Sequence, residues 1–142
     1  MEPEPPQRAL LRANEAFYAA LEARDMDALD RLWLHEGWVR CVHPGRDAIV
    51  GWPAVRRSFV EIFAHTRLLH VTPTAVDVLV FGDLGVIACV ENITLQSEDE
   101  MGMTAAQATN IFRLTDGGWR MMHHHASPAP MHVTQAFDGG VQ

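Results

Sequence analysis

This chain of 142 residues is 48% hydrophobic and 20% charged, a balance typical of a single globular domain that is long enough to bury a core. Eighteen acidic side chains against eleven Lys and Arg give a net charge of −7, which excludes the basic surface that phosphate backbones require. We therefore expect no nucleic-acid partner. The start lacks the basic and apolar regions of a secretory leader, and no run approaches the roughly 18 apolar residues of a membrane span. These features predict a cytoplasmic protein with no membrane partner.

Three helices are expected in the first half of the chain. After a disordered lead over residues 1–6, apolar side chains recur every three or four positions from Gln7 to Arg24, which is the mark of an amphipathic helix. Asp25 is suited to cap a second, shorter helix that runs through Trp33. A third helix opens at residues 51–53, where a proline favours a first helical turn.

Strand-like runs follow. Trp38 to His43 reads as a strand that ends at a Pro-Gly turn. Four β-rich runs with turn residues between them are Leu69 to Phe81, Val86 to Gln96, Ala105 to Leu114 and Trp119 to Ser127. Three helices followed by an antiparallel meander predict an α+β domain over residues 7–128, with a strongly bent sheet wrapped over the helices. Residues 129–142 are loop-like and are expected to form a C-terminal tail that is mobile or docked on a partner subunit.

A glutamate stands on an apolar strand face. Alternation places Glu91 on the same face as four apolar side chains of its run. Burial raises the pKa of a carboxylate towards values useful for an acid or a base, so Glu91 is a candidate catalytic residue. The alternative is that Glu91 faces solvent and that the opposite face, which is also apolar, turns inward.

Asn110 is the one polar side chain on a face that otherwise carries Ala106, Ala108, Phe112 and Leu114. Its amide offers both donors and an acceptor to a bound polar group. The alternative is a buried amide that is satisfied by a neighbouring loop.

The last expected strand contains three consecutive histidines. Strict alternation puts Trp119, Met121, His123, His125 and Ser127 on one face and Arg120, Met122 and His124 on the other. His123 and His125 are therefore candidate catalytic residues that carry protons near neutral pH, or else structural groups that bond to Ser127, Glu91 or the backbone. A metal site would need further ligands, and the chain has no HExxH or paired CxxC motif, so we expect no metal and no cofactor.

The chain is also rich in aromatic side chains, which either pack in the core or line a cavity. The candidates for ligand contact are Trp33, Trp38, Trp52, Phe59, Phe63, Phe112 and Trp119. Single aromatic residues are usually core, but small-molecule sites are mostly apolar with few polar groups, so both interpretations stay open. Tyr18 on the first helix and His43 at the end of a strand are further candidates for ligand contact.

Several of these segments carry a family resemblance. They are Asp25 to Leu29, Val39 to Gly45, Gly51 to Val55, Asn110 to Arg113 and Gly118 to Pro128. Together they resemble the SnoaL-like branch of the nuclear-transport-factor-2-like superfamily over about Gln7 to Pro128. The Trp-x3-His-x-His-x-Ser spacing is also similar to the association domain of calcium/calmodulin-dependent kinase, a non-catalytic relative. The resemblance implies a conical, cystatin-like α+β fold, with three helices on a curved mixed sheet, a central pocket and usually a dimer.

The resemblance also limits the function. The family includes ketosteroid isomerases, polyketide cyclases, dehydratases and epoxide hydrolases, beside members that only bind or assemble. We expect a small-molecule-binding pocket protein that works as a lyase, isomerase or cyclase by proton transfer on an apolar, ring-containing substrate. In this hypothesis Glu91 or a pocket histidine is the base, and Asn110 and Tyr18 orient the substrate. The alternative is a non-catalytic ligand-binding or dimeric assembly module.

Two expectations concern arrangement. Glu91, Asn110, His123 and His125 should line one cavity, because buried ionisable groups need partners. An exposed sheet face that carries Val90, Ile111 and Met122 should be covered by a second copy of the chain, which predicts a homodimer.

Overall fold

The computed structural model describes residues 4–131 and contains three helices and six strands. The helices are α1 (Pro6–Ala23), α2 (Met26–Leu32) and α3 (Trp52–Ala64). The strands are β1 (Arg40–Val42), β2 (Ile49–Val50), β3 (Thr66–Phe81), β4 (Leu84–Ser97), β5 (Met101–Thr115) and β6 (Gly118–Ala129). None of these helices is long and apolar enough to cross a membrane.

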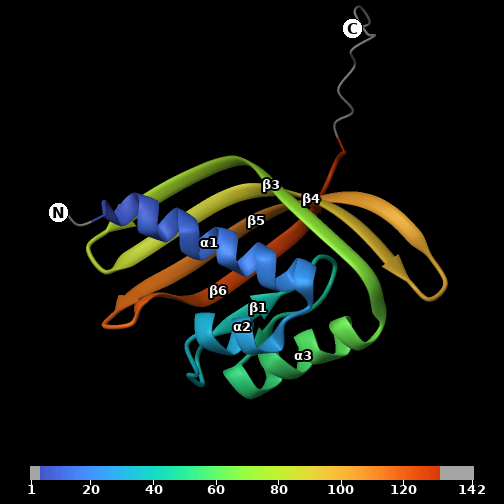
Figure 1. Ribbon diagram of the computed structural model, residues 1–142, viewed down its shortest axis with the longest axis horizontal. Coiled ribbons are helices and arrows are strands. Elements are labelled where there is room, and N and C mark those ends of the chain that lie inside the picture. The colour runs from blue at the N-terminus through green and yellow to red at the C-terminus, as the bar shows by residue number, and fades with distance from the viewer. Residues whose placement is uncertain (1–3, 132–142) are drawn as a thin grey trace, which may run out of the picture.

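All six strands belong to one sheet, in the order β2-β1-β6-β5-β4-β3. Neighbouring strands run antiparallel except β1 and β6, which run parallel. The three helices pack on one face of the curved sheet, with α1 lying across its long strands (Figure 1). The predicted α+β fold, with three helices on a curved mixed sheet, is confirmed.

Local sequence explains where the helices begin and end. α1 starts with Pro6, whose ring suits a first helical turn, and stops at Arg24, which has a φ of 52° in the left-handed region. The Asp25 carboxylate accepts a hydrogen bond from the backbone N–H of Ala28 at 3.1 Å and so caps α2. These boundaries lie within one residue of those predicted from the pattern.

The predicted ends of the domain are shifted slightly. Pro6, placed in the disordered lead, is the first residue of α1, and residues 1–3 lie outside the described part of the chain. Ala129, placed in the tail, is the last residue of β6, and the tail from residue 132 onward lies outside the described part as well. The two-residue strand β2 was not predicted, because two residues are too few to show an alternation.

A bulge in β6 changes which of its side chains face the helices. Ile111 pairs with His123 while Phe112 pairs with Met121, so Met122 is an extra residue in β6. Trp119 and Met121 point into the core before the bulge, and His124 and Ala126 do so after it. The strict alternation that the sequence analysis assumed is therefore wrong from residue 123 onward.

The close contact between α1 and the sheet depends on Gly85 in β4. A Cβ atom at Gly85 would lie 2.6 Å from a methyl carbon of Leu10 in α1 and 3.1 Å from the ring of Trp119. Leu10 is completely buried at this contact. Only glycine lets the helix approach the strand so closely, and this approach holds the polar residues of α1 against the sheet.

Candidate functional site

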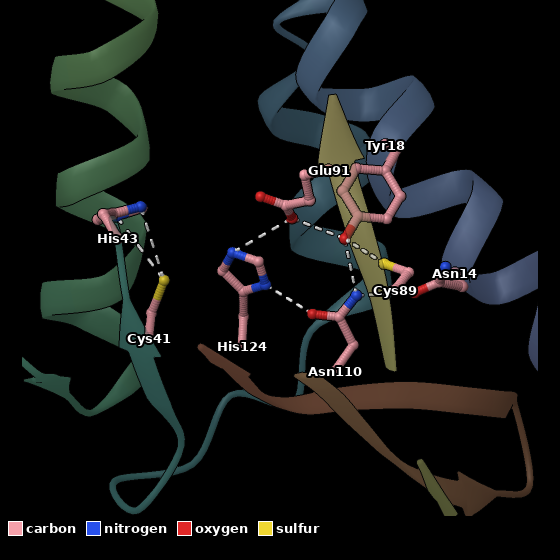
Figure 2. Close-up of polar contacts among 8 residues, drawn as sticks. All are labelled: Asn14, Tyr18, Cys41, His43, Cys89, Glu91, Asn110 and His124. Carbon is pink, nitrogen blue, oxygen red and sulfur yellow. Dashed lines mark hydrogen bonds and ion pairs between the residues drawn. The ribbon is translucent and has the colours of Figure 1, made fainter. Parts of the chain in front are cut away.

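Five buried polar side chains meet between α1 and the sheet. Asn14 and Tyr18 project from α1, Glu91 from β4, Asn110 from β5 and His124 from β6 (Figure 2). None of the five side chains belongs to a residue that is more than 4% exposed. Asn14 and Tyr18 are four positions apart and thus lie on the same helix face. Buried polar groups are costly unless they are bonded, so this cluster is expected to be internally paired.

The hydrogen bonds around Tyr18 have a defined direction. Tyr18 donates its single proton to Glu91 Oε2 at 2.7 Å. Its oxygen therefore accepts the bond from Asn110 Nδ2 at 3.0 Å, and the nearby Cys89 thiol, with Sγ 3.4 Å away, is a further donor to it. The other proton of Asn110 Nδ2 goes to Asn14 Oδ1 at 2.8 Å. Both protons of the Asn110 amide are thus used inside the cluster.

The oxygen of the same amide determines the tautomer of His124. Asn110 Oδ1 lies 2.6 Å from His124 Nδ1 and can only accept, so Nδ1 carries the proton. In the neutral ring the lone pair then lies on Nε2. That atom is 3.9 Å from Glu91 Oε2, which is too far for a direct hydrogen bond. Two acceptors therefore face each other across a short gap.

The second oxygen of Glu91 is uncommitted. Among residues 4–131 the carboxylate accepts a hydrogen bond from Tyr18 alone, and that bond reaches Oε2. Figure 2 shows Oε1 turned away from Tyr18, toward the side where His43 lies. Oε1 is thus free to receive a donor from a bound molecule.

Burial shifts the pKa values of the two facing groups in opposite directions. Desolvation raises the pKa of Glu91, although the hydrogen bond from Tyr18 acts against this rise. Desolvation lowers the pKa of His124 to about 3, and three neighbouring histidines act in the same sense. The ring of His124 is deeply buried, so desolvation dominates this shift. Burial also raises the pKa of Tyr18, so the phenol keeps its proton.

The cluster forms one wall of a cavity of about 110 Å³. The residues that line it are Leu21, His43, Pro44, Phe59, Ile62, Leu69, Val71, Glu91, Ile93 and His124. Its polar lining is confined to Glu91 and two histidines, and the remaining lining is apolar. This composition is typical of a small-molecule site, where a few polar groups orient a ligand in an apolar space.

His43 lines the cavity as a neutral imidazole. Ser58 Oγ gives its proton to the Val55 carbonyl at 2.7 Å, so it accepts a bond from His43 Nε2 at 2.9 Å. Burial lowers the pKa of His43 to about 4, and the charge of Arg46 acts in the same direction. Both imidazoles of the cavity are therefore uncharged near neutral pH.

Several predicted site residues lie here. Glu91, Asn110 and Tyr18 belong to the buried cluster, and His43 and Phe59 line the cavity. Of the two orientations left open for Glu91, the structure has the inward one. The roles of these residues in binding or catalysis stay predictions.

The predicted place of His123 and His125 is wrong. The bulge at Met122 turns both rings to the face of the sheet that no helix covers. There they line a surface depression together with Gln107 and Ser127. Because one extra residue reverses the alternation, His124 lies in the cavity where the sequence predicted its two neighbours.

Most of the aromatic candidates also lie elsewhere. Trp38 is 47% exposed, and Phe63 is only partly buried and does not line the cavity. Trp33, Trp52, Phe112 and Trp119 pack in the hydrophobic core. Trp33 and Trp52 stack on each other with ring centres 5.7 Å apart, which occupies their faces. For Trp33, Trp52 and Phe112 the core interpretation holds, whereas Trp119 also lines a surface depression beside the start of α1.

Sequence reasoning missed two members of the cluster, Asn14 and His124. Asn14 occurs at helical spacing among Leu10, Phe17 and Leu21, and one polar residue on an apolar helix face is the signal that was available. The sequence around His124 carries no such signal. His124 points inward because of the bulge, and the position of the bulge follows from how β6 pairs with β5.

Comparisons with known proteins agree with this architecture. The family model of the SnoaL-like domain matches residues 10–132, which is most of the chain. This chain belongs to the SnoaL-like domain family. A crystal structure from Streptomyces avermitilis, described as a candidate dehydratase of the NTF2-like family, is 36% identical, covers 88% of this chain and 96% of its own, and superposes with a TM-score of 0.83.

Two further relatives of this SnoaL-like protein carry other names. A candidate calcium/calmodulin-dependent protein kinase type II association domain from Thiobacillus denitrificans is 32% identical, covers 91% of this chain and 100% of its own, and has a TM-score of 0.72. The F-box protein SKIP8 of Arabidopsis thaliana is 24% identical over 120 residues, or 84% of this chain. The match covers 49% of SKIP8, so the chain spans about half the length of that curated relative.

Proposed function

We propose that this SnoaL-like protein binds a small organic molecule in the cavity and that Glu91 moves a proton on it. The observation that carries the proposal is the pair of facing acceptors, Glu91 and His124, with 3.9 Å between Oε2 and Nε2 and with pKa values shifted in opposite directions. A buried carboxylate with a raised pKa is a stronger base than an ordinary one and accepts a proton near neutral pH.

Each residue has a role in this proposal. Glu91 takes a proton from one position of the substrate and returns it at another position, or to a leaving group, so that the carboxylate is restored. The lone pair of His124 Nε2 accepts a hydrogen bond from the substrate and orients it. Tyr18 and Asn110 are positioning residues, because they hold the carboxylate and the imidazole in place. The similarity to the candidate dehydratase supports a lyase or an isomerase.

The size of the cavity limits the substrate. An engineered cavity of roughly 150 Å³ holds benzene, and this one measures about 110 Å³. A ring-containing substrate of the kind expected from the family would extend beyond this cavity. By comparison with benzene, which has six heavy atoms, a cavity of this size suits a molecule of about five heavy atoms. The 142 residues include no lysine, so the chain offers no side-chain amine for a Schiff-base intermediate.

The test is a screen followed by isotope exchange. Small compounds that raise the melting temperature are selected first, because a ligand that binds only the folded state stabilises it. Each is then incubated with the protein in D2O, and deuterium incorporation is followed by NMR. We expect exchange that falls by roughly 10²- to 10⁴-fold in Glu91→Gln, since the amide cannot accept the proton. Glu15→Gln, the same change at an exposed glutamate of α1, is the matched control.

The hydrogen bonds of Asn110 inside the buried cluster favour a second function, that of an assembly module. Asn110 has all its amide groups bonded within the cluster, as expected of polar residues that only hold a fold together. The similarity to a kinase association domain supports an assembly module in the same way. This alternative predicts that no small compound stabilises the protein and that no deuterium exchange depends on Glu91.

A further inference from the structure

We propose that the cavity selects a small primary amine in its protonated form, with the ammonium group between Glu91 and His124 and a short apolar tail against the opposite wall. The proposal rests on the proposed function, because it names the substrate class of the same site. It follows from three features of the cavity: the spacing of two acceptors, the absence of a cationic lining residue and the chemistry of the remaining wall.

The gap between the two acceptors fits one atom that carries at least two protons. His124 Nε2 and Glu91 Oε2 are 3.9 Å apart. An atom placed about 2.8–2.9 Å from each, the usual hydrogen-bond distance, would bond to both at once. A hydroxyl has one proton and satisfies one of the two acceptors, and a carbonyl or carboxylate oxygen satisfies neither. An ammonium group has three protons, which leaves one for the free Oε1 of Glu91.

The charge of the lining also favours a cation. Among residues 4–131 no arginine lines the cavity, and burial keeps His43 and His124 neutral, so Glu91 is the lining residue that can bring a negative charge and no lining residue brings a positive one. A buried carboxylate without a counter-charge is unfavourable, and an ammonium group would supply that charge. An anionic ligand would face the carboxylate and the lone pair of His124, and like charge in a buried site is strongly disfavoured.

The rest of the wall accommodates a hydrocarbon tail. It consists of Leu21, Phe59, Ile62, Leu69, Val71 and Ile93 together with Pro44. An aliphatic amine of about five heavy atoms fits the same size limit that holds for the substrate in general.

Binding of this kind would bring a proton of the ligand to Glu91. In a low-dielectric cavity both members of an ammonium–carboxylate pair favour their neutral forms, because desolvation raises the pKa of an acid and lowers that of an amine. One N–H bond of the ammonium breaks and the proton moves to Glu91, which leaves a neutral amine and a carboxylic acid. The proton returns from Glu91 to the amine when the carboxylate is restored, and the lone pair of His124 keeps one remaining N–H in place.

The experiment compares three probes of nearly equal shape: isobutylamine, isobutanol and isobutyrate. Their dissociation constants are measured by NMR titration of the full-length protein in phosphate buffer, since Tris is itself a primary amine. We expect isobutylamine to bind about tenfold or more tightly than isobutanol, because hydrogen bonds to charged groups are stronger than neutral ones. Isobutyrate should bind more weakly than either.

Two variants identify the cause of the preference. In Glu91→Gln the preference of amine over alcohol should fall to about threefold or less, whereas Glu15→Gln should keep it. Dispersed amide NMR signals of Glu91→Gln would show that this variant is folded. Three results with the wild-type protein alone would overturn the proposal. They are equal binding of amine and alcohol, tightest binding of isobutyrate, and no binding of isobutylamine.

The experiments can reject the amine proposal and the proposed function independently of each other. Deuterium exchange that depends on Glu91, together with no preference for amines, overturns the amine proposal and leaves proton transfer standing. A preference for amines without any exchange overturns the proposed reaction and leaves the ligand class standing.

Discussion

Tyr18 has one proton to donate, and its bond to Glu91 sets the direction of the other hydrogen bonds in the cluster. Replacing Tyr18 with Phe removes the one donor to the carboxylate. We expect the pKa of Glu91 to rise further, because that hydrogen bond favours the charged form. The free energy of unfolding should fall by about 1–3 kcal/mol, since Asn110 loses a buried acceptor. Carboxyl-carbon NMR titration measures the pKa, and urea denaturation measures the stability.

The shift of the His124 signals serves as the control for this variant. The bond from His124 to Asn110 does not involve Tyr18, so the tautomer of the imidazole should be retained. A pKa of Glu91 that stays constant or falls in Tyr18→Phe would show that the phenol does not stabilise the carboxylate.

The two buried histidines should make the protein less stable in acid. The pKa values of His43 and His124 fall from 6.5 to about 4 and about 3 in the folded state. Below pH 6.5 the unfolded chain therefore binds protons that the folded chain does not, and stability is lost as the pH falls toward 4. Each histidine contributes about 1.4 kcal/mol per pH unit in this window. Urea denaturation at pH 7, 6 and 5 measures the slope.

Glu91 changes the free energy of unfolding in the opposite direction as the pH falls. Its pKa is raised on folding, so its stabilising contribution is present below its ordinary value of 4.5 and is lost as the pH rises through the folded value. Between pH 6.5 and 5 the stability lost through the two histidines exceeds the stability gained through the one carboxyl group. His124→Gln should therefore reduce the acid-induced loss by about 1.4 kcal/mol per pH unit, and the exposed His125→Gln should not. Equal slopes in the two variants would contradict the burial of a neutral His124.

At the scale of elements, the packing of α1 on β4 depends on a missing side chain. Gly85→Ala would bring a Cβ atom to 2.6 Å from a methyl carbon of Leu10, which is completely buried. We expect a loss of about 1–3 kcal/mol in the free energy of unfolding, because overpacking displaces the helix or its side chains. Guanidinium denaturation of the purified variant provides the value.

Gly102 is the matched control for this substitution. It is a strand glycine as well, in β5, and a Cβ atom there would meet nothing within 4 Å. Gly102→Ala should change stability by no more than about 0.5 kcal/mol, as expected for a surface position. A similar loss in both variants would mean that strand glycines matter here for a reason other than the contact with Leu10.

At the scale of the whole molecule, one face of the sheet remains without a helix (Figure 1). Val90 and Ile111 lie half-buried on it, and Ile111 pairs with His123. Met122, which was predicted on the same face, packs against the hydrophobic core because it is the extra residue of the bulge. We propose that a second copy of the chain covers this face, because monomers rarely expose a continuous apolar patch. Sedimentation at micromolar concentration should show twice the chain mass of 15.8 kDa.

A charge on the uncovered face should separate the two copies. Ile111→Arg should give the single-chain mass with an unchanged far-UV spectrum, since a guanidinium group is costly to bury without a partner. Val60→Arg, at a 39% exposed position on α3, should leave the mass of the wild type unchanged. A wild-type protein that sediments as the 15.8 kDa chain alone would reject the dimer.

The sequence by itself determined the three helices and the longer strands, and it identified two polar residues as candidates without fixing the direction in which they point. Helical spacing from Leu10 to Leu21 and the Asp25 cap predicted α1 and α2, because these signals are local. Glu91 and Asn110 were identified as candidates by their apolar faces, and both are buried. Only the tertiary structure decided which histidine joins them. The bulge at Met122 depends on how β6 pairs with β5, and strand pairing between distant segments leaves no local pattern in the chain.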